Sequence, residues 1–254
     1  MDFRIIFERA FELSHFYYKL IHNYNYMHTK LLYMEDMGTL SCDSLITDIQ
    51  TVDGKHILIL DQTVFYPQGG GQPYDTGTIK NSTIIFKVTE VRFTDGAVHH
   101  IGVYESGEFQ IGDSVVCVVD EERRVLNTRL HSAGHIIDMG LKKLGIPWVP
   151  GKGYHFPNGP YVEYKGLLAN FDLETLKGSL ENVCNEIVQT NIETHISFDD
   201  MTLQNGKPMR TVWYGDFSIP CGGTHVTHLT AVGTIRIRKI KQEKQMIRIA
   251  YTVE

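Results

Sequence analysis

The spacing of hydrophobic and polar residues predicts β structure in the first half of the chain. Residues 31–119 contain short β-prone runs that are separated by Gly, Asp and Asn turns. The runs are LLYMEDM, KHILILD, TVFYP, STIIFKVTEVRF, GAVHHIG and DSVVCVVD. Several strands at this spacing are typical of a small barrel or sandwich. We therefore predict a β-barrel domain over residues 30–119.

The pattern changes to a helical period at Asp120. Apolar residues recur at 125/126, 130, 133, 136/137 and 141, and the helix is expected to end at Gly145, before Pro147. A second helix is predicted over 172–190, with Asp172 as its N-cap. Strands are predicted for IETHISF, MRTVWYG, GTIRIRKI and QMIRIAYTV. Residues 120–254 are thus expected to form a second domain, and the fold class is α+β.

Residues 1–29 are expected to form an N-terminal helical extension. Apolar positions within 2–22 lie on one helix face, while Asp2, Glu8 and Glu12 and the missing cleavage site disfavour a secretory signal or a mitochondrial presequence. Such a helix would pack on the body of the protein or on a second copy, so a homo-oligomer is one expectation. A membrane-surface helix is less favoured. No apolar run is long enough to span a membrane, and we expect no membrane partner.

Composition adds two constraints. The four cysteines form no CxxC pair, which suits a reducing cytoplasm, and we expect a cytoplasmic protein. The net charge of −6 counts against a nucleic-acid partner. The segment 236–248 is nevertheless basic, and it either contacts nucleic acid or is a solvated edge hairpin. Its candidate contact residues are Arg236, Arg238, Lys239 and Lys241.

Two pairs of side chains predict a metal site. His131 and His135 are four residues apart on a predicted helix, so both imidazoles can reach one ion. Cys221 and His225 flank a Gly-Gly turn. Each pair alone has an ordinary explanation in core packing or in a glycine turn. Together they supply three nitrogens and one sulfur, which suit one tetrahedral Zn²⁺ per chain.

The number of ligands leaves the role of that zinc open. Four protein ligands fill a tetrahedral ion, and a filled zinc is usually structural. Catalysis needs a vacant position or an expansion to five ligands.

Two glycine-rich stretches complete the candidate chemistry. In FYPQGGGQPYDTG (65–77), three consecutive glycines allow a very close approach of backbone, and no Gly-Lys-Ser/Thr ending marks a phosphate-binding loop. This stretch is a structural β-loop or part of a pocket wall. GKGYHFPNGPYVE (151–163) suits a loop that approaches a pocket, with Lys152 and His155 as polar candidates.

In this order GGGQPYDTG, HSAGH, GKGYHFPNGPYVEY and CGGTH resemble the AlaX proteins, the free-standing relatives of the alanyl-tRNA synthetase editing domain. The resemblance covers residues from about 30 to the C-terminus and is strongest to the medium-length type with the Gly-rich motif. It implies a β-barrel followed by a zinc-containing editing domain of the alanyl/threonyl-tRNA synthetase type.

The resemblance also implies an activity and a site. Members hydrolyse the ester that joins a wrong amino acid, chiefly serine and sometimes glycine, to alanine tRNA. The implied metal ligands are His131, His135, Cys221 and His225, the first two also as catalytic groups. The implied substrate contacts are Gly70, Gly71, Gln72 and Asp75, with Lys152 and His155 added from the second stretch. The basic strands would contact the tRNA.

Two positions depart from the related synthetase domains. Gly134 stands where Thr is frequent, and Gly151 stands near a frequent Gln, so rules for serine recognition do not transfer to these positions. Three alternatives stay open. They are an editing hydrolase for another mischarged tRNA such as Ser-tRNA(Thr), a non-catalytic tRNA-binding module with structural zinc, and a partner-binding protein that uses the N-terminal helix.

Overall fold

The computed structural model describes residues 28–254 apart from 169–170 and 205–206. Most of the predicted extension over 1–29 therefore lies outside the described residues. Among those described, no helix is both long and apolar enough to cross a membrane.

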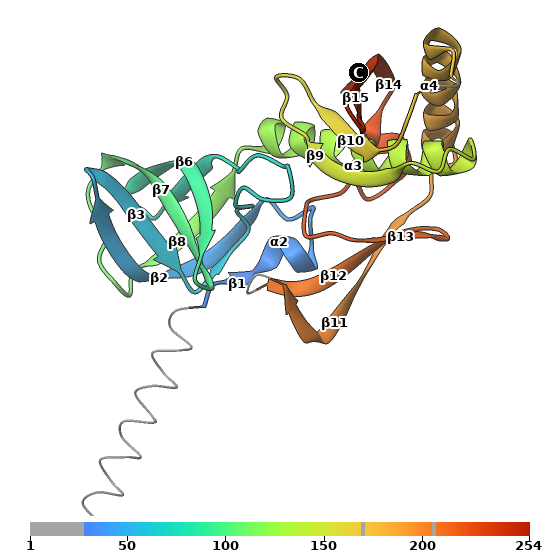
Figure 1. The fold of residues 1–254 in the computed structure, drawn as a ribbon. Coiled ribbons are helices and arrows are strands. Elements are labelled where there is room, and N and C mark those ends of the chain that lie inside the picture. Colours follow the sequence, from blue (N-terminus) through green and yellow to red (C-terminus); the bar gives the residue numbers. More distant parts are fainter. Residues whose placement is uncertain (1–27, 169–170, 205–206) are drawn as a thin grey trace, which may run out of the picture.

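A closed six-stranded barrel forms the first half of the described chain, in the order β2-β3-β7-β6-β5-β8 (Figure 1). Asp53–Gly54 and Asp95–Gly96 have positive φ, as two-residue hairpin turns between twisted strands require. The predicted barrel and the α+β class are confirmed. The barrel strands are β2 (Ser41–Val52), β3 (Lys55–Leu60), β5 (Gly77–Lys80), β6 (Ile85–Thr94), β7 (Ala97–Ser106) and β8 (Ser114–Val119).

The strand predicted for LLYMEDM is wrong. The segment holds β1 (Lys30–Leu31), which pairs with β4 (Gln62–Thr63), and then the short helix α2 (Leu32–Glu35). The backbone turns because Asp36 accepts hydrogen bonds from Gly38 N and Thr39, and because two distant arginines donate to carbonyl groups of this segment. These long-range contacts override the local β propensity.

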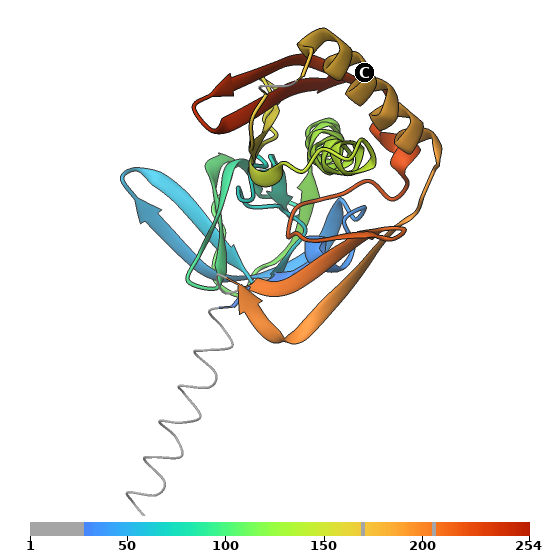
Figure 2. The same ribbon diagram turned by 45° about the vertical axis from the view of Figure 1, so that its right-hand side comes forward.

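The second half of the chain surrounds one long helix, α3 (Glu121–Lys143), which Figure 2 shows nearly end-on. Asp120 caps α3 and Asp172 caps α4 (Leu173–Gln189), so both predicted helices are confirmed. A four-stranded sheet has the order β14-β15-β10-β9, and a three-stranded sheet has the order β11-β12-β13. The remaining elements are β9 (Val149–Tyr154), β10 (Tyr161–Lys165), β11 (Thr194–Gln204), β12 (Lys207–Tyr214), β13 (Phe217–Pro220), the 3₁₀ helix η1 (Leu229–Val232), β14 (Ile235–Glu243) and β15 (Met246–Val253).

The loop expected at 151–163 is instead a pair of strands, β9 and β10, joined by a short connection. Its glycines and prolines give weak local β propensity, but β10 pairs along its whole length with β15, which is more than eighty positions away. Sequence analysis also missed β2, β5 and β13. Nonlocal pairing therefore supplies order that the local sequence does not indicate.

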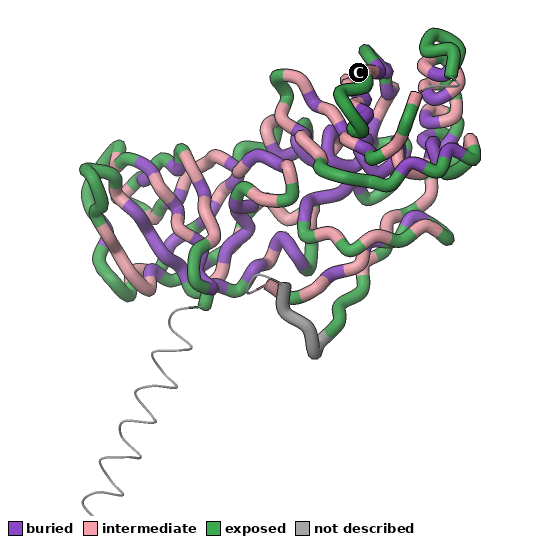
Figure 3. Tube along the Cα trace, in the orientation of Figure 1, coloured by how far each residue is buried: buried purple, intermediate pink, exposed green. Residues whose placement is uncertain are grey.

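Two clusters of buried side chains lie on either side of α3's start. One fills the barrel, and the other packs α3 and α4 against the four-stranded sheet. Figure 3 shows buried residues in the barrel and along α3. Arg124 on α3 ties the two together, because its guanidinium donates to Asp75, Val64 O and Met37 O of the barrel half. The pocket described next lies between the two halves.

Candidate metal centre and editing pocket

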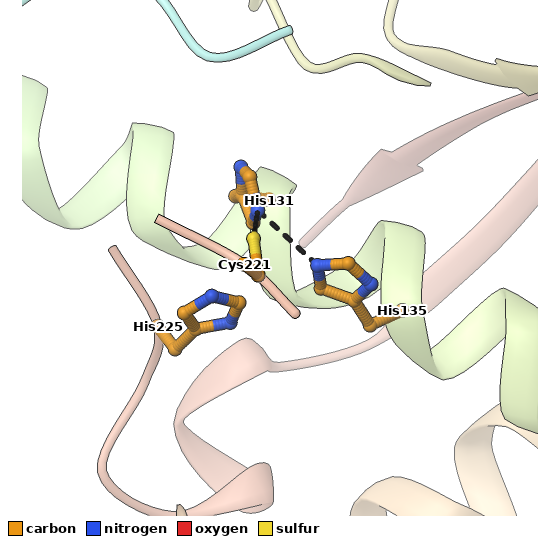
Figure 4. A group of neighbouring side chains, drawn as sticks. All are labelled: His131, His135, Cys221 and His225. Atoms are coloured by element: carbon orange, nitrogen blue, oxygen red, sulfur yellow. Dashed lines mark hydrogen bonds between the residues drawn. The ribbon is translucent and has the colours of Figure 1, made fainter. Parts of the chain in front are cut away.

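The structure brings the two predicted ligand pairs together (Figure 4). His131 and His135 lie one turn apart on α3, and Cys221 and His225 lie on the loop after β13. One ligand atom from each residue lies within 4.8 Å of the others. His131 Nε2 is 3.1 Å from Cys221 Sγ and 3.2 Å from His135 Nε2. Helix periodicity and a glycine turn thus assemble a four-ligand set.

The chemistry of this cluster fits a metal ion. His131 Nδ1 and His225 Nε2 are buried nitrogens that make no hydrogen bond within the described part of the chain. Such orphaned nitrogens are costly, and a cation bound by the cluster would satisfy His225 Nε2, while His131 would offer Nε2, the nitrogen that lies beside Cys221 Sγ and His135 Nε2. Three imidazoles and one thiol are the donor set that zinc prefers. Burial lowers the pKa of His131 and His225 well below the ordinary value, which keeps both rings neutral.

Polar groups behind the ligands orient them. His135 Nδ1 lies 3.4 Å from the Asp138 carboxylate, which also accepts a 2.5 Å hydrogen bond from Tyr164 Oη. His225 Nδ1 lies 2.6 Å from Tyr214 Oη, so that ring presents Nε2 to the cluster. Carboxylate and hydroxyl partners of this kind hold metal-binding imidazoles in position.

Neighbouring polar groups raise the pKa of His135 and lower the pKa of Cys221. Burial by itself lowers the pKa of His135, but hydrogen bonds to Asp138 and Cys221 outweigh it and raise the pKa to about 10. Burial by itself raises the pKa of the Cys221 thiol, yet His135 and Arg210 bring it below the ordinary value. A lowered pKa favours the thiolate, and the thiolate is the form of cysteine that binds a cation.

Side chains from distant segments hold the Cys221–His225 loop. Arg210 of β12 donates to the carbonyl oxygens of Cys221, Gly223 and Met34. Thr224 N donates to Gln72 Oε1 at 3.0 Å, and Gln72 Nε2 donates back to Thr224 Oγ1 at 2.8 Å. A Cβ at Gly223 would stand 2.4 Å from the His131 ring. Glycine is therefore required there if the loop is to approach α3.

A cavity of about 520 Å³ opens beside the cluster. Its wall combines α3, the β9–β10 hairpin, the barrel and the loop after β13. This size suits a small-molecule or aminoacyl site. Polar or ionisable side chains in this wall include His131, His135, Asp138, His155, Arg210 and Cys221.

The Gly-rich stretch divides into pocket wall and support. Gly69 and Gly70 line the cavity. Gly71 lies against the hairpin, where a Cβ would come within 2.2 Å of Gly153 O, and its carbonyl accepts from His155 N. Gln72 and Asp75 are fully buried, the first on Thr224 and the second on Arg124. Their predicted role at the substrate stays a prediction, and the geometry favours shaping the pocket from behind.

His155 lies in a slot made by glycines. Its ring centroid is 4.6 Å from that of His131, and a Cβ at Gly134 would meet its Cε1 at 2.5 Å. The ring therefore occupies the space that a side chain at position 134 would need. Gly134, which stands where related domains frequently have Thr, therefore leaves room for the His155 ring.

Hydrogen bonds assign the tautomer of His155. Tyr251 Oη donates to Leu130 O at 2.9 Å, because a carbonyl can only accept. Tyr251 Oη must then accept from His155 Nδ1 at 2.6 Å. Nδ1 carries the hydrogen, and Nε2 is an acceptor that bonds to no described residue. Burial, and secondarily the charge of His135, lowers the pKa of His155 to about 3, so the ring is neutral at pH 7.

The other predicted contacts lie farther out. Lys152 is exposed on the cavity rim. Among the basic candidates, Arg236 pairs with Glu181 and Glu254, and Lys241 pairs with Glu243. Arg238 donates to Tyr251 O, and Lys239 is exposed. Their contact with tRNA stays a prediction.

Sequence analysis missed several residues that support the site. Asp138 is three positions after His135, so an HxxxHxxD pattern on one helix face was the available signal. Arg210 and Tyr214 share the buried face of β12 with Val212, and alternation in MRTVWYG was the signal for them. Tyr251 carried no comparable signal, because its contact with His155 spans 96 positions.

Comparisons with known proteins agree with this architecture. The family model for class II tRNA synthetases of type A matches residues 12–123, which begins within the segment assigned to the extension. The alanyl-tRNA editing protein AlaX-L of Pyrococcus horikoshii is 30% identical over 231 residues, which are 87% of this chain and 57% of that protein. The chain belongs to the AlaX family.

The chain is also similar to part of longer proteins, the alanine–tRNA ligases. The alanine–tRNA ligase of Haloquadratum walsbyi is 31% identical over 82% of this chain and 24% of the ligase. That of Acidithiobacillus ferridurans is 34% identical over 71% of the chain and 22% of the ligase. The chain thus spans between about a fifth and somewhat over half of these relatives. The medium-length AlaX type predicted from the motifs stays a prediction.

Proposed function

We propose that this protein hydrolyses the ester bond of alanine tRNA that carries serine, with glycine as a second substrate. The observation that carries this proposal is the four-ligand His and Cys cluster beside a cavity, in a chain related to an alanyl-tRNA editing protein. A synthetase pocket for alanine excludes serine and glycine poorly, and a separate hydrolytic site is the remedy.

His131, His135, Cys221 and His225 would hold one zinc ion per chain. When bound, zinc supplies a Lewis acid for the ester carbonyl or its attacking water. Asp138 and Tyr214 keep the imidazoles in the ligating orientation. Arg210 of β12 holds the Cys221 loop through the carbonyl oxygens of Cys221 and Gly223 and contributes a fixed positive charge. His131 and His135 thus act in the reaction as ligands.

His155 would recognise the serine hydroxyl, because Gly134 and Gly151 have no side chain that could do so. His155 lines the cavity, its Nε2 carries no proton, and a serine hydroxyl would be a matching donor to that nitrogen. Bound alanine would leave that acceptor unpaired, which costs about 1–3 kcal/mol. Cognate Ala-tRNA(Ala) would therefore be hydrolysed more slowly than Ser-tRNA(Ala), and so would Gly-tRNA(Ala), because glycine also lacks the hydroxyl.

The test is a deacylation panel. Wild type, Cys221→Ala and Cys42→Ala are incubated with seryl-, glycyl- and alanyl-tRNA(Ala) and with Ser-tRNA(Thr), and zinc is measured in each protein. Cys42 is a half-buried barrel cysteine and serves as the matched control. We expect release of serine from alanine tRNA by wild type and by Cys42→Ala, and a loss of roughly 100-fold or more in Cys221→Ala.

Other outcomes contradict the proposal. Equal activity in Cys221→Ala would remove the cluster from the mechanism. Turnover of Ser-tRNA(Thr) alone would assign a different editing substrate. Binding of tRNA without any turnover would support a non-catalytic module, which the complete set of four zinc ligands favours.

A further inference from the structure

Four planar groups stack on the outer side of the β9–β10 hairpin. The rings of Phe156 and Tyr154 are 4.5 Å apart at 16°, and those of Tyr154 and Tyr161 are 5.2 Å apart at 17°. The Arg248 guanidinium lies 4.0 Å from the Tyr161 centroid and is held by Glu163. We call Phe156, Tyr154, Tyr161 and Arg248 the aromatic ladder. Arg248 closes one end, and Phe156 is the terminal ring at the other.

Strand register places cations beside this ladder. Lys239, Ala250, Tyr161 and Tyr154 are paired in one row across all four strands, so their side chains share a face. Lys241 pairs with Arg248 in the next row. The alternate row of Ile240, Ile249 and Val162 is buried against the helices. This face of the sheet thus presents flat rings and positive charge together, rather than an aliphatic surface.

The hairpin that carries the ladder also forms part of the cavity wall. Gly153, His155 and Val162 line the cavity, and they alternate along the hairpin with Tyr154, Phe156 and Tyr161. Lys152 and Gly151 on the cavity rim are exposed. One hairpin therefore faces the ester site with one side and carries the ladder on the other.

We propose that the aromatic ladder binds the unpaired 3′ nucleotides of a tRNA, through stacking of a base on Phe156 and contact of phosphates with Lys239 and Lys241. This inference rests on the proposed function, because the amino acid in the cavity would be esterified to that strand. Proteins that hold single strands combine parallel aromatic faces with a basic groove, and each stacked base contributes about 1–3 kcal/mol.

The test measures affinity for uncharged tRNA(Ala) by fluorescence anisotropy, with intact tRNA and with tRNA trimmed of its unpaired 3′ nucleotides. Phe156→Leu removes the flat ring but keeps an apolar side chain. Phe171→Leu is the matched control, since Phe171 is another partly exposed ring, stacked edge-on to Trp148 outside the ladder. We expect Phe156→Leu to bind intact tRNA about tenfold more weakly, with trimmed tRNA unaffected.

Phe171→Leu should match wild type on both RNAs. The proposal is overturned if Phe156→Leu binds intact tRNA as tightly as wild type, or if it loses equal affinity for trimmed tRNA. Hydrolysis of seryl-adenosine, an ester without the polynucleotide, separates this result from the proposed function. Equal rates for wild type and Phe156→Leu would show an intact site. Absence of hydrolysis of Ser-tRNA(Ala) by wild type would contradict the proposed function, while the binding assay would still test the ladder.

Discussion

Buried polar groups gather in two regions of this protein, and the two regions differ in whether those groups are satisfied. At the junction with the barrel, Asp75 and Arg124 are almost fully buried, and the carboxylate accepts from Tyr66 N as well as from the guanidinium. In the cluster of His131, Cys221 and His225, two ring nitrogens have no partner among the described residues.

The difference separates support from function. A buried ion pair whose polar groups all have hydrogen-bond partners holds two elements in one position without any bound ligand. A buried set of donors that is incomplete costs stability unless a ligand completes it. Removal of a charge should therefore be most harmful at the junction, whereas changes near the cluster should mainly alter what it binds.

The largest effect is expected from Arg124→Met. Loss of the guanidinium leaves Asp75 buried without its counter-charge, and the free energy of unfolding should fall by about 3–5 kcal/mol. Urea denaturation measures this. Lys143→Met is the control, because its pair with Glu186 is exposed, and it should change stability by less than about 1 kcal/mol. A similar small change in both variants would remove the distinction between the two regions.

His100 in the barrel is a second buried group whose hydrogen bonds are complete, and it should make stability depend on pH. It donates through Nδ1 to Leu58 O and accepts from Thr63 Oγ1, and burial lowers its pKa to about 4. An unfolded histidine takes up a proton near pH 6.5, whereas folded His100 does so only near pH 4. Falling pH in this window therefore favours unfolding, by roughly 3 kcal/mol in total.

His100→Gln should lose this part of the pH dependence when urea denaturation is repeated between pH 7 and 4. His195→Gln, at an exposed position, should retain it. A wild-type slope in His100→Gln would mean that other groups produce the acid sensitivity.

At the cluster, Asp138→Asn should weaken zinc binding by about 10–100-fold, because the amide orients His135 less well than a carboxylate. Competition with a chromophoric chelator measures the affinity. Asp216→Asn, at an exposed turn, should bind zinc as wild type does. Unchanged zinc affinity in Asp138→Asn would mean that Asp138 serves only as the hydrogen-bond acceptor of Tyr164 and does not orient His135.

The smallest effect is expected from alanine substitutions at two helical glycines. Gly178 on α4 has no atom near the place of a Cβ, and Gly178→Ala should stabilise the protein by about 1 kcal/mol. Gly134→Ala should instead destabilise it by about 1 kcal/mol, because the new methyl group meets the His155 ring. Thermal unfolding of both variants decides. Equal gains would show that the ring is not held over position 134.

The residues differ in how far their roles were predictable. Helix period placed His131 and His135 on one face, and a glycine turn placed Cys221 near His225, so both pairs could be proposed from spacing. The substrate role of Asp75 and Gln72 stays a prediction, and their contacts with Arg124 and Thr224, which lie 49 and 152 positions away, were not predicted. Local sequence carries no information on contacts at that separation.

The sequence by itself determined the periodic elements, the caps at Asp120 and Asp172, and the ligand pairs, because each depends on residues within a few positions of one another. Only the tertiary structure decided that the two pairs meet, that residues 149–154 and 161–165 form strands, and that Tyr251 makes His155 Nε2 an acceptor. Those outcomes require segments more than eighty positions apart to pack together, and the free energy of packing, rather than local propensity, selects them.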